Sequence, residues 1–492
     1  MSGRYVISID QSTQGTKALL FDKNGVLMCR CDVAHKQIIN DLGWVSHDPE
    51  EIYENVITAV KGVISKANIS PELVVSVGIS NQRETSLIWE KETGKPLNHA
   101  VVWQCARAAS ICERSEIKEI EAYIYKTTGI KLSPYFPAAK IAWLLENTMG
   151  AGKLADNNAI CHGTMDSYLV YRLTGGQVYA TDYSNASRTQ LFDIFNLKWD
   201  ERICSAFGIE VSNMPKVMDS DSCYGYTDFE GLLSEKIPIH GVMGDSHAAL
   251  FGQDCCEKGK TKATYGTGSS IMMNIGEKPI LSKNGLVTSL AWGRGGHVQY
   301  VLEGNLNYTG AVITWLKDDL GLIENAAETE KFANEATRDD ELYLVPAFTG
   351  LGAPYWNFRA KAAIIGMDRT TGKAEFCRAA LECIAYQITD IVKAMSEDSG
   401  VTLSELRVDG GPTRNEYLMQ FQSDMAGCKV LVPNQEELSG IGAAYMAGIA
   451  AGLWDDSILS KLKRTVHEPT MDEKKVKSKY EGWKKAVETV NK

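Results

Sequence analysis

The sequence predicts an α/β protein made of two domains of related build, residues 1–252 and 253–492. A chain of this length suits more than one domain. Strand-like runs alternate with helical periodicity, which is typical of a mixed sheet covered by helices. An arrangement of strand, polar turn and strand opens the chain and recurs after residue 260, which indicates a duplicated unit. No proline- or serine-rich linker marks the joint near residues 252–260.

The first domain is expected to begin with a three-stranded unit at residues 5–10, 17–22 and 26–33. Asn24-Gly25 is a hairpin signal between the second and third strands. A helix should start at Pro49 with Asp48 as its N-cap, because proline suits the first helical turn and an aspartate side chain accepts from free backbone N–H groups. A buried strand follows at residues 74–80.

The second domain repeats this opening with strands at residues 262–265 and 270–275. Farther along, the pattern predicts a long helix, a strand, an apolar helix and a polar terminal helix, at residues 374–396, 406–409, 440–451 and 474–492. The order of these elements again favours an α/β unit.

Composition excludes several classes of function. The formal net charge of −11, without a long basic run, argues against a sequence-independent grip on nucleic acid. The N-terminus lacks the apolar core of a signal peptide, and no apolar stretch reaches the ~20 residues of a membrane span. The twelve cysteines lack metal-ligand spacing, as expected of reduced thiols in a cytoplasmic protein.

Three glycine- or hydroxyl-rich turns follow predicted strands, at residues 10–16, 265–268 and 409–413. Small residues let backbone N–H groups approach phosphate oxygens, and hydroxyl groups add donors. One such turn alone most often only reverses the chain, but three in duplicated halves favour phosphate binding. The sequence contains neither GxxxxGK[ST] nor GxGxxG after its first strand, which argues against a P-loop enzyme and a dinucleotide fold.

Two aspartates are candidates for phosphoryl-transfer chemistry. Asp245, which follows Gly244, could accept the proton of a substrate hydroxyl as its oxygen attacks the γ-phosphorus of ATP. The alternative is an N-cap of the following helix. Asp10 ends the first strand and could bind Mg²⁺ through water. The alternative is that it caps its own turn.

Candidate acceptor residues lie elsewhere in the first domain. Arg83 offers a fork of donors and Glu84 a paired acceptor for neighbouring hydroxyls of a polyol, unless they form a surface ion pair. Trp103 and Tyr135 could present apolar faces to the carbon side of such a substrate, unless they are core residues. We interpret His247 as structural because Asp245 suffices for this chemistry.

Two long motifs resemble the FGGY carbohydrate kinases of the sugar kinase, actin and heat-shock ATPase superfamily. They are residues 135–147, and residues 362–367 continuing to 375–382. Within this family the chain is most similar to glycerol kinases over nearly its whole length. The shared segments are residues 43–49, 81–85, 89–96, 102–105, 181–189, 345–356 and 407–411.

The resemblance implies two ribonuclease-H-like domains around an interdomain cleft that binds ATP and substrate, with closure before transfer. It also implies a homodimer or homotetramer. Asp245 matches the catalytic base, and Arg83, Glu84, Trp103 and Tyr135 match substrate positions. The nucleotide-contact positions are matched by Thr13, Thr267, Gly268, Gly310, Gly411 and Asn415.

Departures from the glycerol kinase pattern concentrate around the acceptor. Ser246 stands where a glutamine is typical, and Ser270 where a phenylalanine is typical. Both changes remove bulk, and the second replaces an apolar wall with a hydroxyl, so we expect an acceptor of four or five carbons and a raised KM for glycerol. The first turn also departs from the glycerol kinase pattern, because it keeps Thr13 as a hydroxyl donor but has different residues beside it. Some bacterial glycerol kinases have a glycine- and arginine-rich loop that binds a sugar bisphosphate regulator. The corresponding residues 228–237 lack that character, so we expect no such regulation.

Two other functions stay open. One is a pentulose kinase of the xylulokinase or ribulokinase type. The other is a non-catalytic ATP-binding protein of the actin-like superfamily, either a filament protein or a sensor. Asp245 together with Arg83 and Glu84 favours an enzyme, because ATP binding alone does not need an acceptor site.

Overall fold

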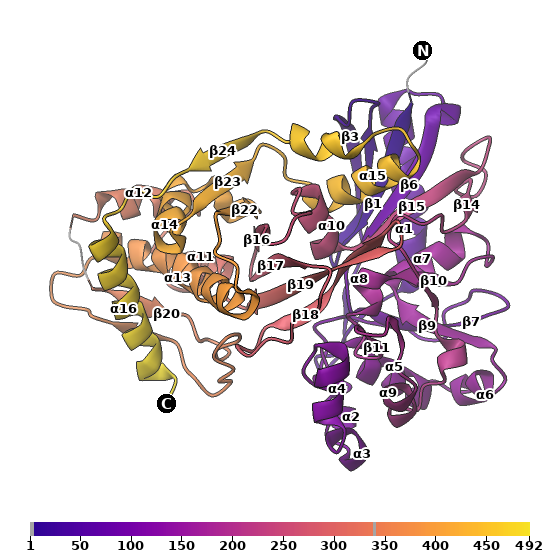
Figure 1. The fold of residues 1–492 in the computed structure, drawn as a ribbon, viewed down its shortest axis with the longest axis horizontal. Coiled ribbons are helices and arrows are strands. Elements are labelled where there is room, and N and C mark those ends of the chain that lie inside the picture. Colours follow the sequence, from indigo (N-terminus) through magenta and orange to yellow (C-terminus); the bar gives the residue numbers. More distant parts are fainter. Residues whose placement is uncertain (1–3, 338–340) are drawn as a thin grey trace.

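The computed structural model describes residues 4–337 and 341–492. It contains two large sheets, each covered by helices, one in each half of the chain (Figure 1). This confirms the expected two-domain α/β architecture. Among the described residues, no helix is both long and apolar enough to span a lipid bilayer.

The six-stranded first sheet has the order β14-β15-β6-β1-β2-β3. Strands β1 to β3 pair antiparallel, whereas β6 runs parallel to β1 and β15 runs parallel to β6. The strands are β1 (Tyr5–Gln11), β2 (Gly15–Phe21), β3 (Leu27–Ala34), β6 (Val74–Asn81), β14 (Tyr226–Thr227) and β15 (Ile237–Gly244). The predicted opening unit and the strand after it are therefore confirmed.

Helix α1 (Pro49–Ala67) packs on this sheet and begins as predicted. The Asp48 side chain accepts from Glu50 N at 3.0 Å, which satisfies one of the free N–H groups of the first turn. The apolar face of this helix is buried, with Val56 and Val60 fully inaccessible. The helix ends at Asn68 in the left-handed conformation.

A smaller five-stranded sheet and several short helices complete the N-terminal half. Its strands are β4 (Ile38–Ile39), β5 (Val45–His47), β7 (Ser86–Glu90), β8 (Ala100–Val101) and β9 (Ile160–Thr164). Two short pairs join β10 (Ala180–Asp182) to β13 (Lys216–Met218) and β11 (Phe192–Asp193) to β12 (Lys198–Trp199). The helices are α2 (Ala109–Cys112), α3 (Ser115–Lys118), α4 (Glu121–Thr128), α5 (Pro137–Asn147), α6 (Ala151–Asp156), α7 (Met165–Leu173), α8 (Tyr183–Ala186) and α9 (Glu201–Ala206).

The seven-stranded second sheet has the order β18-β19-β17-β16-β22-β23-β24. Its strands are β16 (Thr261–Tyr265), β17 (Ser269–Gly276), β18 (Val287–Arg294), β19 (His297–Leu306), β22 (Glu405–Asp409), β23 (Lys429–Pro433) and β24 (Arg464–His467). Strands β16, β17 and β19 pair antiparallel, and β22 runs parallel to β16. This repeats the pairing of β1, β2, β3 and β6, so the duplicated unit inferred from the sequence is present.

Helix α13 (Lys373–Ser399) packs on this sheet, and its buried residues form one core with the apolar residues of β17 and β19. Around it lie α11 (Gly310–Thr314), a π-helical turn at Trp315–Asp319, α12 (Glu328–Glu335), α14 (Glu416–Ala426), α16 (Glu473–Val490) and the pair β20 (Tyr343–Val345) with β21 (Ala363–Ile365). The terminal helix α16, expected to be polar, buries Trp483, Ala486 and Val487.

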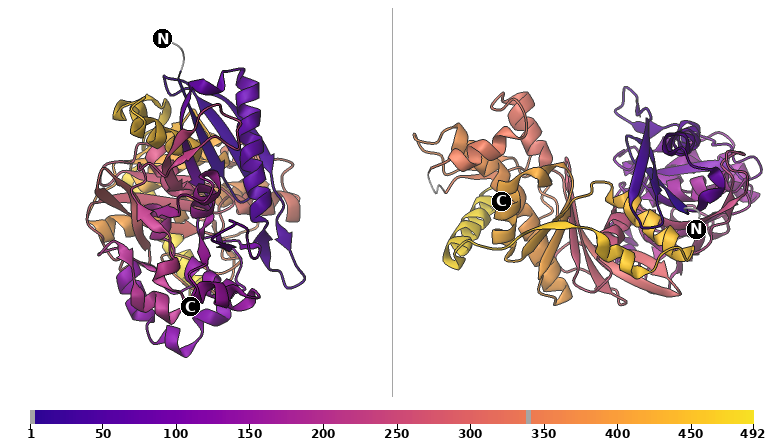
Figure 2. Two further views of the ribbon diagram at one scale, coloured as in Figure 1. Left: turned by 90° about the vertical axis from the view of Figure 1, so that its right-hand side faces the viewer. Right: turned by 90° about the horizontal axis from the view of Figure 1, so that it is seen from above.

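Two helices connect the halves. Helix α10 (Asp245–Gly252) follows the first sheet, and α15 (Leu438–Ala450) comes from late in the chain, yet α15 contacts α10 and strands β1, β6 and β15. In Figure 2 the yellow segment that contains α15 lies beside the indigo strands of the first sheet. The sequence did not show that this helix covers the N-terminal sheet.

Candidate active site

Asp245 lies where strand β15 ends and helix α10 begins. Gly244 is needed before it, because a Cβ there would come 2.7 Å from the Arg83 Cγ atom. Asp245 Oδ1 accepts from Ser246 N at 2.6 Å and lies 3.2 Å from Arg83 Nε. Gly244 occupies the N-cap position and Asp245 the first helical position, where the Asp245 side chain accepts from a free N–H of the first turn. Burial raises the pKa of Asp245, and Arg83 partly offsets this.

Arg83 and Glu84 belong to a buried network of four charges. The Arg83 guanidinium donates to both carboxylate oxygens of Glu303, at 3.1 and 2.9 Å. Arg188 donates from Nε to Glu84 Oε1 and from Nη1 to Glu303 Oε2, both at 2.6 Å. Each of the four side chains is at most 7% exposed. The alternative of a surface ion pair between Arg83 and Glu84 is therefore wrong, because both residues are buried and bond to other partners.

The sequence reasoning missed Arg188 and Glu303 as members of this site. A signal for Glu303 was present, because it is a single acid within an apolar strand, β19. Arg188 lies within the segment 181–189 that resembles glycerol kinases. A charged side chain that is buried requires a buried partner of opposite charge. A search for such partners could have identified both Glu303 and Arg188.

Glu84 also departs from regular backbone geometry. Its φ of 60° lies in the left-handed region, which costs a non-glycine residue free energy and persists only where the surroundings hold it. Here the bond from Arg188 and the Thr85 N–H donated to Arg83 O hold the turn after β6. The turn thereby fixes the direction of Arg83 and Glu84, the two candidates for binding the acceptor substrate.

Trp103 and Tyr135 form an aromatic wall. Their rings pack edge to face with centroids 5.7 Å apart, and both side chains are half-buried rather than in the core. Trp103 Nε1 donates to Thr13 Oγ1 at 2.9 Å. An expected acceptor residue therefore touches an expected nucleotide residue, which places the first turn beside the aromatic wall.

The two serines that depart from the glycerol kinase pattern differ in their bonding. Ser270 Oγ donates to Glu303 Oε1 at 3.1 Å, so it joins the network that holds Arg83. Ser246 is half-buried, and its hydroxyl has no hydrogen-bond partner among the described residues. Its hydroxyl is thus available to a ligand.

A cavity of about 480 Å³ in the C-terminal half brings together Gly310, Gly411 and Asn415. Apolar side chains from α11, α13 and α14 line it, including those of Ile313, Ile384 and Leu418. Asn415 also caps α14, because its Oδ1 accepts from Leu418 N at 2.9 Å. A cavity of this size and character suits a flat heteroaromatic group.

The turn of Thr267 and Gly268 is fastened to the start of α11. Gly310 N donates to Gly266 O at 2.9 Å, and Ala311 N donates to Thr267 O at 3.0 Å. A Cβ on Gly268 would lie 2.3 Å from Leu306 O, and one on Gly410 would lie 1.9 Å from Tyr265 O. The second and third predicted turns therefore touch, and their backbones approach too closely for larger residues.

Asp10 lies near the end of strand β1 in the first sheet, and Asp409 ends strand β22 in the second sheet. Asp10 Oδ1 accepts from Ser80 Oγ at 3.1 Å and from no N–H of its own turn, so the alternative that it caps that turn is wrong. Burial raises the pKa of Asp10 to about 6, which Lys17 partly offsets and Asp245 reinforces. No group of three or more acidic, histidine or cysteine side chains suited to a metal occurs in residues 4–337 and 341–492.

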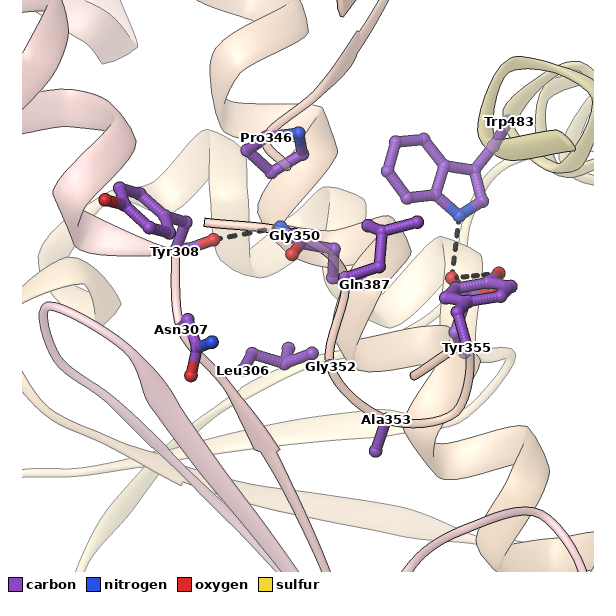
Figure 3. A pocket seen from close by; sticks show the side chains of 12 residues that line it. Leu306, Asn307, Tyr308, Pro346, Gly350, Gly352, Ala353, Tyr355, Gln387 and Trp483 are labelled. Carbon is purple, nitrogen blue, oxygen red and sulfur yellow. Dashed lines mark hydrogen bonds between the residues drawn. The ribbon is translucent and has the colours of Figure 1, made fainter. Parts of the chain in front are cut away.

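A second, much smaller cavity of about 20 Å³ lies beside Asn307 and Gln387 (Figure 3). At one side Trp483 Nε1 donates to Asp390 Oδ2 at 2.8 Å, and Tyr355 OH donates to the same oxygen at 2.9 Å. This volume holds about one water molecule, so the cavity is no substrate site. Its bonds fasten α16 to α13.

Comparison with known proteins agrees with this geometry. Residues 5–252 match the FGGY family of carbohydrate kinases, N-terminal domain, and residues 261–451 match the C-terminal domain. Glycerol kinase 1 of Thermotoga maritima is 49% identical over 98% of this chain and 99% of its own. Glycerol kinase of Carboxydothermus hydrogenoformans is 45% identical over 99% and 98%.

Solved structures show the same fold. The crystal structure of Plasmodium falciparum glycerol kinase with ADP superposes with a TM-score of 0.93 at 35% identity, covering 99% of this chain and 98% of its own. A ligand-bound xylulose kinase from Lactobacillus acidophilus gives 0.89 at 20% identity over 99% and 98%, which supports the fold alone. With both family domains matched and relatives near half identity over full length, the chain belongs to the FGGY family of carbohydrate kinases.

Proposed function

We propose that the chain transfers the γ-phosphoryl group of ATP to a terminal hydroxyl of a small polyol or open-chain sugar. The observation that carries this proposal is the position of Asp245 beside Arg83 and the buried network of charges. Asp245 Oδ1 accepts from Ser246 N and pairs with Arg83, whereas its Oδ2 has no hydrogen-bond partner among the described residues. The hydroxyl gives its proton to Asp245, and its oxygen bonds to the γ-phosphorus. The bond between that phosphorus and the β–γ bridging oxygen breaks, and ADP leaves.

The nucleotide would lie along the C-terminal half. The cavity at Gly310, Gly411 and Asn415 suits the adenine ring, and the turn at Thr267 and Gly268 offers backbone N–H groups to phosphate oxygens. Thr13 would contribute from the first domain, with closure of the two domains excluding water.

Asp10 fits a magnesium role by the chemistry of its carboxylate. Its raised pKa, about 6, shows that burial disfavours its charged form, and a nearby cation would restore that form. Mg²⁺ retains several waters and binds through one or two carboxylates together with substrate phosphates, whose charge it neutralises when bound. Asp10 would hold such a hydrated ion through water.

For the acceptor, we propose a polyol or ketose of four or five carbons. Ser246 and Ser270 provide hydroxyl groups where glycerol kinases typically have a glutamine and a phenylalanine, and a larger, more polar pocket would leave glycerol loosely packed. The full-length relatives named glycerol kinase make glycerol the direct competitor for this assignment. A pentulose is the second candidate, because Ser246 has a free hydroxyl.

We also propose that the enzyme works in the cytoplasm as a homodimer or homotetramer, without control by a sugar bisphosphate. The location follows from the cysteines, which are all free as expected of reduced thiols, and the oligomeric state follows from the family resemblance. The lack of control by a sugar bisphosphate follows from residues 228–237, which contain no arginine and a single glycine, Gly231.

A coupled assay of ADP release tests the acceptor and the base together. The panel is glycerol, erythritol, threitol, pentitols, xylulose and ribulose. Asp245→Asn should lower kcat by about 10²- to 10⁴-fold on the best acceptor, because it removes the general base. Asp41→Asn changes the same side chain at an exposed position and should leave kcat within about twofold.

The outcomes separate the hypotheses. If no polyol or sugar stimulates ADP release, the kinase assignment fails and a non-catalytic ATP-binding role is favoured. If glycerol has the highest kcat/KM, the chain is a kinase but the larger acceptor is wrong. If xylulose or ribulose has the highest kcat/KM, the pentulose alternative is right.

A further inference from the structure

A row of polar side chains crosses four strands of the second sheet. In the observed register Asn305 of β19 lies opposite Ser270 of β17, Ser270 opposite Thr264 of β16, and Thr264 opposite Asp409 of β22. Residues directly opposite each other in neighbouring strands point to the same face of a sheet. The row therefore extends, on one face, from the third phosphate turn to Asn305.

This face is the one that meets the acceptor site. Glu303 lies two residues before Asn305 and shares its face, and it bonds to Arg83, Arg188 and Ser270. The flanking residues Leu302 and Leu306 point the other way, into the core that contains α13. Asn305 is thus one strand beyond Ser270, on the side away from Asp409.

Asn305 differs from its neighbours in the row because its amide is unused. It is half-buried, and its side chain has no hydrogen-bond partner among the described residues, whereas Ser270 bonds to Glu303. Adjacent strands are about 4.8 Å apart, so one ligand can contact both Ser270 and Asn305. A half-buried amide facing a ligand site gains most from a ligand that completes its hydrogen bonds.

We propose that Asn305 determines acceptor specificity by hydrogen bonding to a hydroxyl or carbonyl oxygen at the end of the acceptor that is not phosphorylated. The inference rests on the proposed kinase function and identifies the substrate class more narrowly. An amide offers two donors and one acceptor and carries no charge, which suits a neutral polyol or ketose. Arg83 and Arg188 are already occupied by Glu84 and Glu303, so neither guanidinium is free for the carboxylate of a sugar acid.

On this proposal the three carbons of glycerol are held at Asp245, Arg83 and Glu84. Only an acceptor with a fourth or fifth carbon would carry an oxygen past Ser270 to Asn305. Asn305 should therefore discriminate between acceptors by length. A change at Asn305 should alter the ratio of kcat/KM values, while the transfer step itself is unaffected.

The test compares glycerol with the best four- or five-carbon acceptor in the full-length enzyme. Asn305→Leu keeps the branching and removes the hydrogen bonds. It should lower kcat/KM for the longer acceptor at least tenfold, mainly through KM, and leave glycerol within twofold. Asn307→Leu, the same change at an exposed position two residues later, should alter neither. A sugar acid such as an aldonate should not be phosphorylated.

The results distinguish the two levels of the argument. A wild-type enzyme that prefers glycerol contradicts the longer acceptor of the proposed function before any variant is measured. A wild-type preference for the longer acceptor that Asn305→Leu leaves unchanged contradicts only the role of Asn305. Equal losses on both acceptors also contradict it. Asn305→Ser, a smaller change, provides the same comparison if the leucine variant does not fold.

Discussion

Arg188 decides how Arg83 and Glu84, the two residues proposed to bind the acceptor, are held. Its fork bonds to Glu84 on one side and to Glu303 on the other, and Glu303 in turn holds Arg83. Burial by itself would raise the pKa of Glu303, but Arg188 and Arg83 hold that pKa well below its ordinary value. Glu303 therefore stays ionised, and Arg188 acts on the acceptor through Glu84 and Glu303 as a positioning residue.

Replacement of Arg188 by lysine should separate acceptor binding from chemistry. Lysine keeps the charge, but its single nitrogen cannot reproduce a fork between two carboxylates. In Arg188→Lys we expect KM for the acceptor to rise about tenfold, which corresponds to ~1.4 kcal/mol, with kcat and KM for ATP changed less. Steady-state kinetics with each substrate varied in turn measures this split.

Two further variants complete that test. Arg188→Met leaves two buried carboxylates short of a cation and should destabilise the fold by ~3–5 kcal/mol in denaturant unfolding. Arg202→Lys, at an exposed position, should change neither stability nor kinetics. If the role of Arg188 were purely structural, Arg188→Lys would have the same KM values as the wild type and would differ only in a lower free energy of unfolding.

Residues within one motif could be predicted from the sequence, and partners from distant segments could not. Asp245 follows Gly244 beside a predicted helix, and Arg83 and Glu84 follow a predicted strand, so local patterns indicated them. The bond from Arg188 to Glu84 joins residues 104 positions apart, and that from Arg83 to Glu303 joins residues 220 apart. No local pattern encodes such a pairing.

At the scale of elements, the turn of Thr267 and Gly268 and the start of α11 behave as one unit. Gly310→Ala should disturb it, because the new Cβ would lie 2.5 Å from the backbone oxygen of Gly266. The hydrogen bond from Gly310 N to that oxygen would then lengthen, and the turn would shift. We expect KM for ATP to rise about tenfold, ~1.4 kcal/mol, while KM for the acceptor changes little.

Initial rates at varied ATP, together with nucleotide binding by calorimetry, measure this effect. The helical Gly152→Ala is a suitable control, because a Cβ there would meet nothing within 4 Å. An unchanged KM for ATP in Gly310→Ala would show that the phosphates do not contact this turn.

Local patterns predicted whether an element is a helix or a strand better than they predicted which of its side chains are buried. The Asp48-Pro49 start of α1 and the strands on either side of the polar turns were predicted correctly, because capping and alternation are local. Helix α16 was expected to be polar, yet it buries Trp483 and Ala486 against the second domain. A few apolar residues in a charged helix suffice once a complementary core exists.

At the scale of the whole molecule, the two halves are joined by a helix pair. Helix α15 is buried along nearly its whole length, and its contacts are with α10 and the first sheet. Its sequence is apolar all round, which predicts burial but does not specify the partner. The duplicated sheets could thus be anticipated from the repeated strand and turn pattern, and the crossing of α15 to the first sheet could not.

This crossing brings the two helix backbones together at glycines, so it should couple stability to catalysis. A Cβ on Gly442 of α15 would lie 1.8 Å from Ala248 O of α10, and one on Gly252 of α10 would lie 2.7 Å from Leu438 O. Gly442→Ala must therefore push α10 away, and overpacking of this kind costs about 1–3 kcal/mol. Because α10 begins at Asp245, we expect kcat to fall about tenfold for every acceptor, with the order of acceptor preference unchanged.

Denaturant unfolding and the acceptor panel together measure both effects of Gly442→Ala. Gly152→Ala is the matched control here too, and it should keep kcat and gain up to ~1 kcal/mol, as expected for alanine in an open helical position. Loss of stability without loss of kcat would contradict the coupling, since it would mean that the helix pair yields at α15 and leaves Asp245 in place. Loss of both would show that a helix from late in the chain sets the position of Asp245, the proposed base, at the end of the first sheet.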